Sequence, residues 1–445
     1  MKTRDPAFRA SRYRATLAPL ALALLVALST GNARAARLDY QFELTGLHSD
    51  NLNLSENNQA NESVLVPRLR FDLKEEGASV ELHARGDIER RHYFGNEFDD
   101  ETRAEFAGQL KWALFPQRMH LVVEDYLSEE PINFRDGRYP GNLQRVNIFL
   151  GGPSFFARLG DTSRLQIDVR GADSQAEVSR GFDSRRYSAA AALQHDINAT
   201  SNVSLHLAHT RVEFDQPETT IVDYTRQDGY VRYEGRLRDI EYQLDAGRSR
   251  LDRENADNES TTLARATVQW QVNPQNRLRF RARHQFADEV QDLVVRLSDP
   301  DESLVPDLVD SSSSLVTAGV YRQSDVELDY RFSGDRLGFR VRPIYRQLRY
   351  ISRLDADRTE NAVIYQASYR LTPLTRIVFD GSYRKRDFRT IDELDRDHVY
   401  ALGIEQQRTR HWGWRAQVVR NERDSNLPDP VYKENAVLVT LWWKR

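Results

Sequence analysis

The sequence has no cysteine among its 445 residues, which excludes disulfide bonds and thiolate chemistry. After the N-terminus, no segment approaches 18 uninterrupted apolar residues, so a helical membrane protein is excluded as well. Nucleophile motifs, phosphate-binding loops and zinc-ligand spacings are also missing. We therefore expect no catalytic residues, no metal and no cofactor, although a barrel enzyme can assemble its site from distant strands.

Residues 1–35 have the composition of a secretory signal peptide. A basic segment from Lys2 to Arg14 precedes an apolar run from Ala15 to Leu28, and Ala33-Arg34-Ala35 fits a cleavage site. The alternative, an uncleaved membrane anchor, is disfavoured because the run is short and contains Pro19. We expect a single mature domain, residues 36–445.

The mature chain is acidic. Without residues 1–35 it carries 57 Lys and Arg against 66 Asp and Glu, a net charge of −9. This balance argues against nucleic acid as a partner.

Apolar and polar residues alternate along most of the chain. From Leu278 to Phe286, large apolar or small residues alternate with arginine, which is typical of a β-strand with one apolar and one charged face. The same period recurs from Leu38 to Thr45 and from Ile377 to Tyr383. A mean hydropathy of −0.67 fits a membrane β-barrel, in which only the lipid face is apolar.

The connections between these segments differ in length. Short turns occur at 75–77, 115–118, 160–162, 273–276, 333–335 and 372–375, and longer acidic connections at 50–62, 131–142, 252–260, 355–361 and 424–435. Short periplasmic turns and long extracellular loops are typical of bacterial outer-membrane barrels, whereas a β-sandwich gives no reason for such sorting. A soluble propeller, which a period of about 40 residues could suggest, is disfavoured because no blade motif repeats. We count nine short and ten long connections, which predicts an antiparallel up-and-down barrel of about 20 strands, or alternatively 18. The count is least certain at 143–160, where Gly151-Gly152-Pro153 interrupts the pattern, and at 313–332.

Aromatic residues gather where the predicted strands end. Trp112, Phe115, Trp270, Phe332, Trp412 and Trp414 lie near short turns, and Tyr93, Phe94, Tyr126, Tyr224 and Tyr350 near long loops. We interpret them as two girdles at the bilayer interfaces. The last predicted strand ends in Trp442-Trp443, an aromatic terminus like that of outer-membrane barrels, although Lys444 and Arg445 follow it.

With the apolar face toward lipid, the opposite face lines a lumen rich in arginine. The chain has only six lysines, and the arginines predicted to line the pore are Arg265, Arg279, Arg281, Arg283, Arg340, Arg342, Arg346, Arg370, Arg384 and Arg386. Guanidinium groups bind carboxylates in a bidentate manner, so this wall is a candidate track for an acidic polymer. Alternatively, Asp325, Glu327 and Asp329 neutralise the arginines in cross-strand ladders that stiffen the barrel.

The longest connection runs from about Glu289 to Ser314. A solvated extracellular loop is the interpretation we prefer. The alternatives are a constriction folded into the pore and a lid over its mouth.

The segments Ser49-Asp50-Asn51-Leu52-Asn53-Leu54-Ser55 and Leu65-Val66-Pro67-Arg68-Leu69, with the alternating strands that follow, resemble the putative β-barrel porin 2 family. The resemblance implies an outer-membrane barrel linked to exopolysaccharide operons and PEP-CTERM systems, and it supplies no catalytic residues. The expected partners are outer-membrane lipid and lipopolysaccharide, the barrel-assembly machinery, exopolysaccharide and periplasmic export proteins. The expected function is a conduit or accessory for exopolysaccharide export in the bacterial outer membrane. A general diffusion porin and a non-conducting barrel that anchors polysaccharide at the surface are the alternatives.

Overall fold

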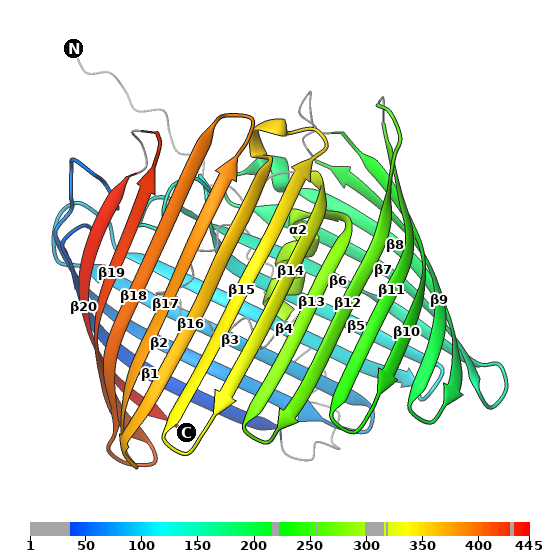
Figure 1. Cartoon of the computed structure of the whole chain (residues 1–445), viewed down its shortest axis with the longest axis horizontal. Coiled ribbons are helices and arrows are strands. Elements are labelled where there is room, and N and C mark those ends of the chain that lie inside the picture. The colour runs from blue at the N-terminus through cyan, green and yellow to red at the C-terminus, as the bar shows by residue number, and fades with distance from the viewer. Residues whose placement is uncertain (1–35, 216–221, 255, 299–315, 317–318, 428–430) are drawn as a thin grey trace.

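The computed structural model describes residues 36–215, 222–254, 256–298, 316, 319–427 and 431–445. The expected signal peptide, residues 1–35, lies outside the described residues. The chain forms one antiparallel sheet of 20 strands that closes into a barrel (Figure 1). This architecture confirms the predicted fold class and the preferred strand number.

The strands follow one another around the barrel in chain order. The first ten are β1 (Arg37–Ser49), β2 (Glu62–Glu76), β3 (Val80–Tyr93), β4 (Glu101–Phe115), β5 (Met119–Pro131), β6 (Leu143–Arg158), β7 (Ser163–Ala176), β8 (Ser184–Asn198), β9 (Ser201–Phe214) and β10 (Tyr224–Arg236). The second ten are β11 (Ile240–Arg253), β12 (Glu259–Asn273), β13 (Asn276–Asp288), β14 (Val320–Ser333), β15 (Leu337–Tyr350), β16 (Arg358–Thr372), β17 (Thr375–Phe388), β18 (Glu393–Gln407), β19 (Trp412–Ser425) and β20 (Tyr432–Lys444). The helical segments are η1 (Arg180–Phe182), α2 (Glu289–Ser298) and η2 (Leu354–Ala356).

The first and last strands close the barrel. β1 and β20 pair antiparallel from Gln41–Lys444 to Ser49–Ala436. The Phe42 and Trp443 rings stack across this junction with centroids 6.0 Å apart. Closure leaves no free sheet edge, and this allows a β-structure to span a bilayer.

The two faces of the wall differ as the alternation predicts. Leu44, Leu207, Leu402 and Leu441 are exposed on the outer surface. Asp245, Asp325 and Arg340 are buried on the inner side. Among the described residues, no helix is long and apolar enough to cross a membrane. An apolar outer band around a closed, polar-lined barrel identifies a porin-like barrel of the outer membrane.

The strand count depends on the continuity of β6. Its Gly151-Gly152-Pro153 segment does not end the strand, since pairing with β5 runs unbroken from Met119–Phe155 to Pro131–Leu143. Gly152 adopts a φ of +155°, and a Cβ at this position would collide with the Val169 carbonyl. Glycine is therefore required where the strand bends.

The prediction of an aromatic girdle near the long loops is wrong for four of its five residues. Tyr93, Tyr126, Tyr224 and Tyr350 are all buried. Each falls on the lumen side of its strand, because the strict period of two places it on the same face as inward charged residues. Only Phe94 is exposed there, at 64%.

The preferred interpretation of the longest connection is also wrong for its described part. Residues 289–298 form helix α2, which Figure 1 shows inside the barrel. The rest of the predicted loop, 299–314, lies outside the described residues. The lumen therefore contains a folded element, in keeping with the constriction that we considered as an alternative.

Candidate functional site in the lumen

The central feature of the lumen wall is a charge ladder on three neighbouring strands. Strand β14 pairs Asp329, Glu327 and Asp325 with Arg279, Arg281 and Arg283 of β13. On its other side, Asp325 pairs with Arg346 of β15. Arg283 Nε lies 3.0 Å from Asp325 Oδ2, and Arg340 Nη2 lies 2.6 Å from Asp329 Oδ2. Arginine thus flanks a carboxylate row on both sides, which is the ladder arrangement.

The structure places all ten predicted arginines on the inner side of the wall. Outside the ladder, Arg265 Nε lies 3.6 Å from Asp245, and its guanidinium lies 4.8 Å from the Tyr230 ring centroid. Arg386 Nη2 donates to Asp397 at 2.7 Å. Arg384 pairs with Glu360. Arg370 is set apart, because it donates to the Asp335 carbonyl at the short-turn end.

Helix α2 begins directly where β13 ends. Asp288 caps it, since its Oδ1 accepts a hydrogen bond from the Gln291 amide at 3.0 Å. Asp292 lies in the first turn and Arg296 in the last, so these two charges complement the helix dipole. The local sequence therefore favours a helix at this position.

The apolar face of α2 packs against the wall formed by β5 to β7. Val290 and Leu293 are buried together with Tyr126, Val146, Ile148 and Phe182. Val294 and Leu297 pack against the same group. These four helix positions follow the i, i+3, i+4, i+7 spacing of one helix face. Because α2 starts on β13 and packs on β5 to β7, it crosses the lumen.

Charged contacts fix the polar side of α2. Arg346 Nη2 on β15 lies 3.0 Å from Asp292 Oδ1. Arg226 Nη1 on β10 donates to Gln291 Oε1 at 2.9 Å. The C-terminal end is held through Arg296 to Glu130 and through Arg85 to the Leu297 carbonyl. The helix is thus tied to β3, β5, β10 and β15.

The two carboxyl groups on α2 differ in their proton affinity. Burial raises the pKa of Glu289 to about 8, and the hydroxyl of Tyr350 donates to it. Burial acts in the same direction on Asp292, but the nearby Arg346 and Arg283 guanidinium groups hold its pKa below the ordinary value. At neutral pH the helix therefore presents one charged carboxylate to the arginine wall and one neutral carboxyl group.

A second insertion enters the lumen from the opposite side. The loop 132–142, between β5 and β6, carries Phe134 to a cluster with Tyr321, Leu348 and Phe388 on β14, β15 and β17. The backbone carbonyls of Phe134 and Arg135 accept hydrogen bonds from Arg386 and Arg423, respectively. Both insertions thus join walls that face each other across the barrel.

The sequence contains a local signal for α2 that the alternation of apolar and polar residues does not reveal. Asp288 is a favoured cap residue, and the apolar positions of 290–297 repeat at helical spacing. For the inward course of the loop 132–142 we find no comparable local signal. Its contacts depend on residues more than 200 positions away in the chain.

Comparisons with known proteins find outer-membrane proteins that are only distantly similar to this chain. No protein-family model and no curated protein matches the chain. Among solved structures, the FrpB iron transporter of Neisseria meningitidis has 8% identity and a TM-score of 0.42, over 92% of this chain and 82% of that one. OccK2 (OpdF) of Pseudomonas aeruginosa has 12% identity and a TM-score of 0.40, over 93% and 98%. A mutant of the ferric enterobactin receptor PfeA of P. aeruginosa has 8% identity and a TM-score of 0.46, over 92% and 81%. The assignment of this chain as a closed barrel rests on its own strand pairing.

Proposed function

We propose that the barrel is a gated conduit for an acidic exopolysaccharide, with α2 as its gate. The observation that carries the proposal is the contact between Asp292 of α2 and Arg346 of the wall. It supports the view that this wall recognises carboxylates presented from within the lumen. A uronic-acid polymer would offer the same group and would compete with the helix for the arginines.

The sequence resemblance to the putative β-barrel porin 2 family implies an exopolysaccharide as cargo, and the arginine wall is our reason for proposing an acidic one. In this role, periplasmic export proteins deliver the polymer to the short-turn end, and the barrel-assembly machinery inserts the protein. The wall combines arginine with carboxylates, so it binds an acidic chain weakly at many points. Weak, repeated contacts suit a polymer that must keep moving.

The test is transport of labelled oligosaccharides by proteoliposomes that contain the refolded mature barrel. Oligogalacturonate and a neutral dextran oligomer of equal length are compared. We expect preferential passage of the acidic chain. In Arg279→Gln/Arg281→Gln/Arg283→Gln, that preference should fall, because half of the ladder loses its charge. Arg396→Gln/Arg420→Gln on the outer face is the matched control and should behave as wild type.

Two results would overturn the proposal. Equal passage of both oligomers in the wild type would indicate a general diffusion porin. Passage of neither oligomer, in the wild type and also in a variant from which α2 is removed, would favour a barrel that anchors polysaccharide at the surface. The presence of both α2 and the loop 132–142 in the lumen is the observation that favours this second candidate.

A further inference from the structure

Two neighbouring strands separate near the long-loop end of the wall. The backbone pairing between β12 and β13 ends at the pair Ala264–His284. Beyond it, β12 continues to pair with β11 as far as Glu259, and β13 continues to pair with β14 as far as Asp288. Within the described residues, no strand pairing joins residues 259–263 of β12 to residues 285–288 of β13. We call this gap between β12 and β13 the seam. It arises because β13 bends toward the lumen, where it leads into α2.

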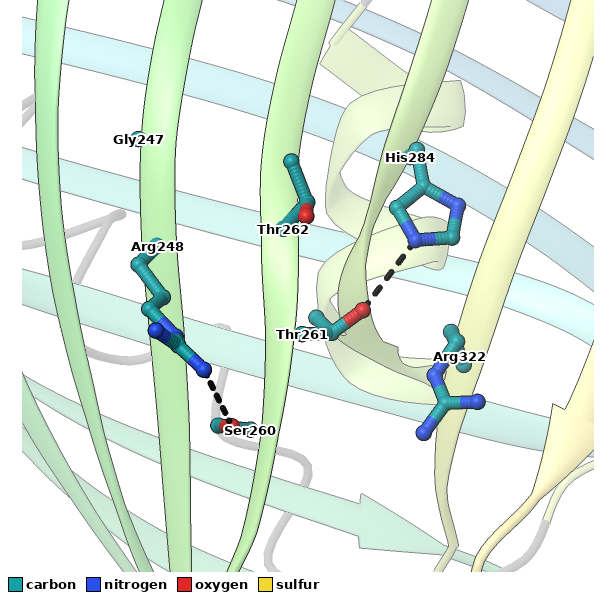
Figure 2. A pocket seen from close by; sticks show the side chains of 7 residues that line it. All are labelled: Gly247, Arg248, Ser260, Thr261, Thr262, His284 and Arg322. Atoms are coloured by element: carbon teal, nitrogen blue, oxygen red, sulfur yellow. Dashed lines mark hydrogen bonds between the residues drawn. The ribbon is translucent and has the colours of Figure 1, made fainter.

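A cavity of about 510 Å³ lies at this seam, and basic and hydroxyl groups line it. Figure 2 shows the cavity with α2 behind the strands, so the cavity is viewed through the wall from outside the barrel. Its lining residues are Gly247, Arg248, Ser260, Thr261, Thr262, His284 and Arg322. The alternation places Arg248 on the outer face with Leu244, and His284 on the outer face with Leu278. The cavity therefore opens toward the membrane.

The charged side chains that line this cavity, Arg248 and Arg322, are both basic. Arg248 Nη2 donates to Ser260 Oγ at 3.3 Å, and no carboxylate pairs with Arg248 among the residues that the structure describes. Arg322 Nη2 lies 3.5 Å from Glu259 Oε2. His284 forms hydrogen bonds through both ring nitrogens, with Thr261 at 3.1 Å and Ser324 at 2.7 Å. Two arginines with a single carboxylate leave the cavity positively charged.

A second, more apolar cavity of about 640 Å³ adjoins the first and shares Arg248 with it. Small outward residues on β8 and β10, among them Ala189, Ala191 and Gly229, form its floor with Ile167 and Leu207. Arg250, His209, Gln227 and Asp228 also line it, and the Asp228 carboxylate is paired with Arg226. Together, the two cavities form an amphipathic groove, which we call the seam groove. It is basic at the seam and apolar along β8 to β10.

We propose that the seam groove binds one outer-leaflet glycolipid, with its phosphate on Arg248 and Arg322 and an acyl chain along β8 to β10. Guanidinium groups bind phosphate through paired, charge-assisted hydrogen bonds. The apolar part of the groove lies where the wall faces lipid, so the ligand is a phosphorylated lipid of the lipid A type and not free phosphate. The bound headgroup closes the seam that β13 leaves behind α2.

The experiment measures binding of bisphosphorylated lipid A to the detergent-solubilised mature barrel by native mass spectrometry. Dephosphorylated lipid A with the same acyl chains and inorganic phosphate are the comparison ligands. We expect Arg248→Gln/Arg322→Gln to weaken lipid A binding about tenfold or more, since both charge-assisted contacts to the phosphate are lost. Arg396→Gln/Arg420→Gln, on the outer face of β18 and β19, is the matched control and should change binding less than about twofold, since these residues lie outside the groove.

Three outcomes would contradict the proposal. They are equal losses in the two double variants, equal binding of phosphorylated and dephosphorylated lipid A, and inorganic phosphate competing as well as the lipid. Folding of every variant is checked by its heat-modifiable migration in gels. If Arg248→Gln/Arg322→Gln does not fold, Arg248→Lys/Arg322→Lys takes its place. This variant keeps the positive charges and removes the planar guanidinium groups that bind phosphate in a bidentate manner. It should show an intermediate loss, and wild-type affinity in it would overturn the proposal.

Discussion

Arg346 on strand β15 and Asp292 on helix α2 form an ion pair with 3.0 Å between Nη2 and Oδ1. The two residues are 54 positions apart, and one belongs to the wall and the other to the helix in the lumen. The same arginine faces Asp325 on the neighbouring strand. The ion pair thus links the charge ladder of the wall directly to helix α2.

Asp292→Asn should release α2 from the wall more often. The substitution keeps the size of the side chain and leaves Arg346 without this carboxylate, which costs about 3 kcal/mol for a pair shielded from water. The ratio of released to docked helix should rise about 100-fold. Single-channel recordings should show correspondingly longer high-conductance periods. Asp161→Asn, in an exposed short turn, is the control, and identical gating in the two variants would contradict the prediction.

Leu293→Ala should loosen α2 without unfolding the barrel. Leu293 is fully buried against β5 to β7, and its truncation costs about 3 kcal/mol through lost packing and a cavity. Hydrogen exchange of the α2 amides should become about 100-fold faster, while strand amides keep their protection. Val295→Ala changes the exposed face of the same helix and should have little effect. Equal acceleration in both variants would show that the packing of Leu293 does not hold the helix.

Docking of α2 should weaken as the pH rises. Burial raises the pKa of Glu289 to about 8, against an ordinary value of 4.5 in the released helix. Between pH 4.5 and 8, Glu289 is protonated when α2 is packed against the wall and ionised when α2 is released. The free energy that Glu289 contributes to docking is therefore complete below pH 4.5. It is lost as the pH rises toward 8, at about 1.4 kcal/mol per pH unit.

The charged and titratable groups that face Glu289 are Tyr350, Arg358, Asp292, Arg346 and Tyr321. Open probability should therefore increase between pH 5 and 8 and level off above 8. Glu289→Gln imitates the protonated side chain and should remove most of this pH dependence. A wild-type profile that is flat over this range would disprove the role of Glu289.

The barrel could be predicted from the sequence because one rule applies to every strand. A period of two, with lipid outside, assigns each side chain to a face, and the turns set the number of strands. The same rule explains the error over Tyr126 and Tyr224. Position near a strand end suggested an interface, whereas the alternation places both residues in the lumen.

The contents of the lumen could be predicted only in part. The alternation places the arginines from Arg279 to Arg283 inside, and the acidic row of β14 suggests their partners. Helix α2 has its own local signal in Asp288 and in the spacing of Val290 and Leu293. Its docking on β5 to β7 has no local signal, because the surfaces that meet there lie more than 100 residues apart in the chain.

The most direct test of the gate is single-channel conductance of the refolded mature barrel in a planar bilayer. Wild type is compared with a variant in which a short Gly/Ser linker replaces residues 289–318. We predict small, brief openings in the wild type and a large, stable conductance in the variant, because removing α2 opens the lumen between β13 and β5 to β7. Equal conductance in the two proteins, with the variant correctly folded, would contradict the assignment of α2 as the gate.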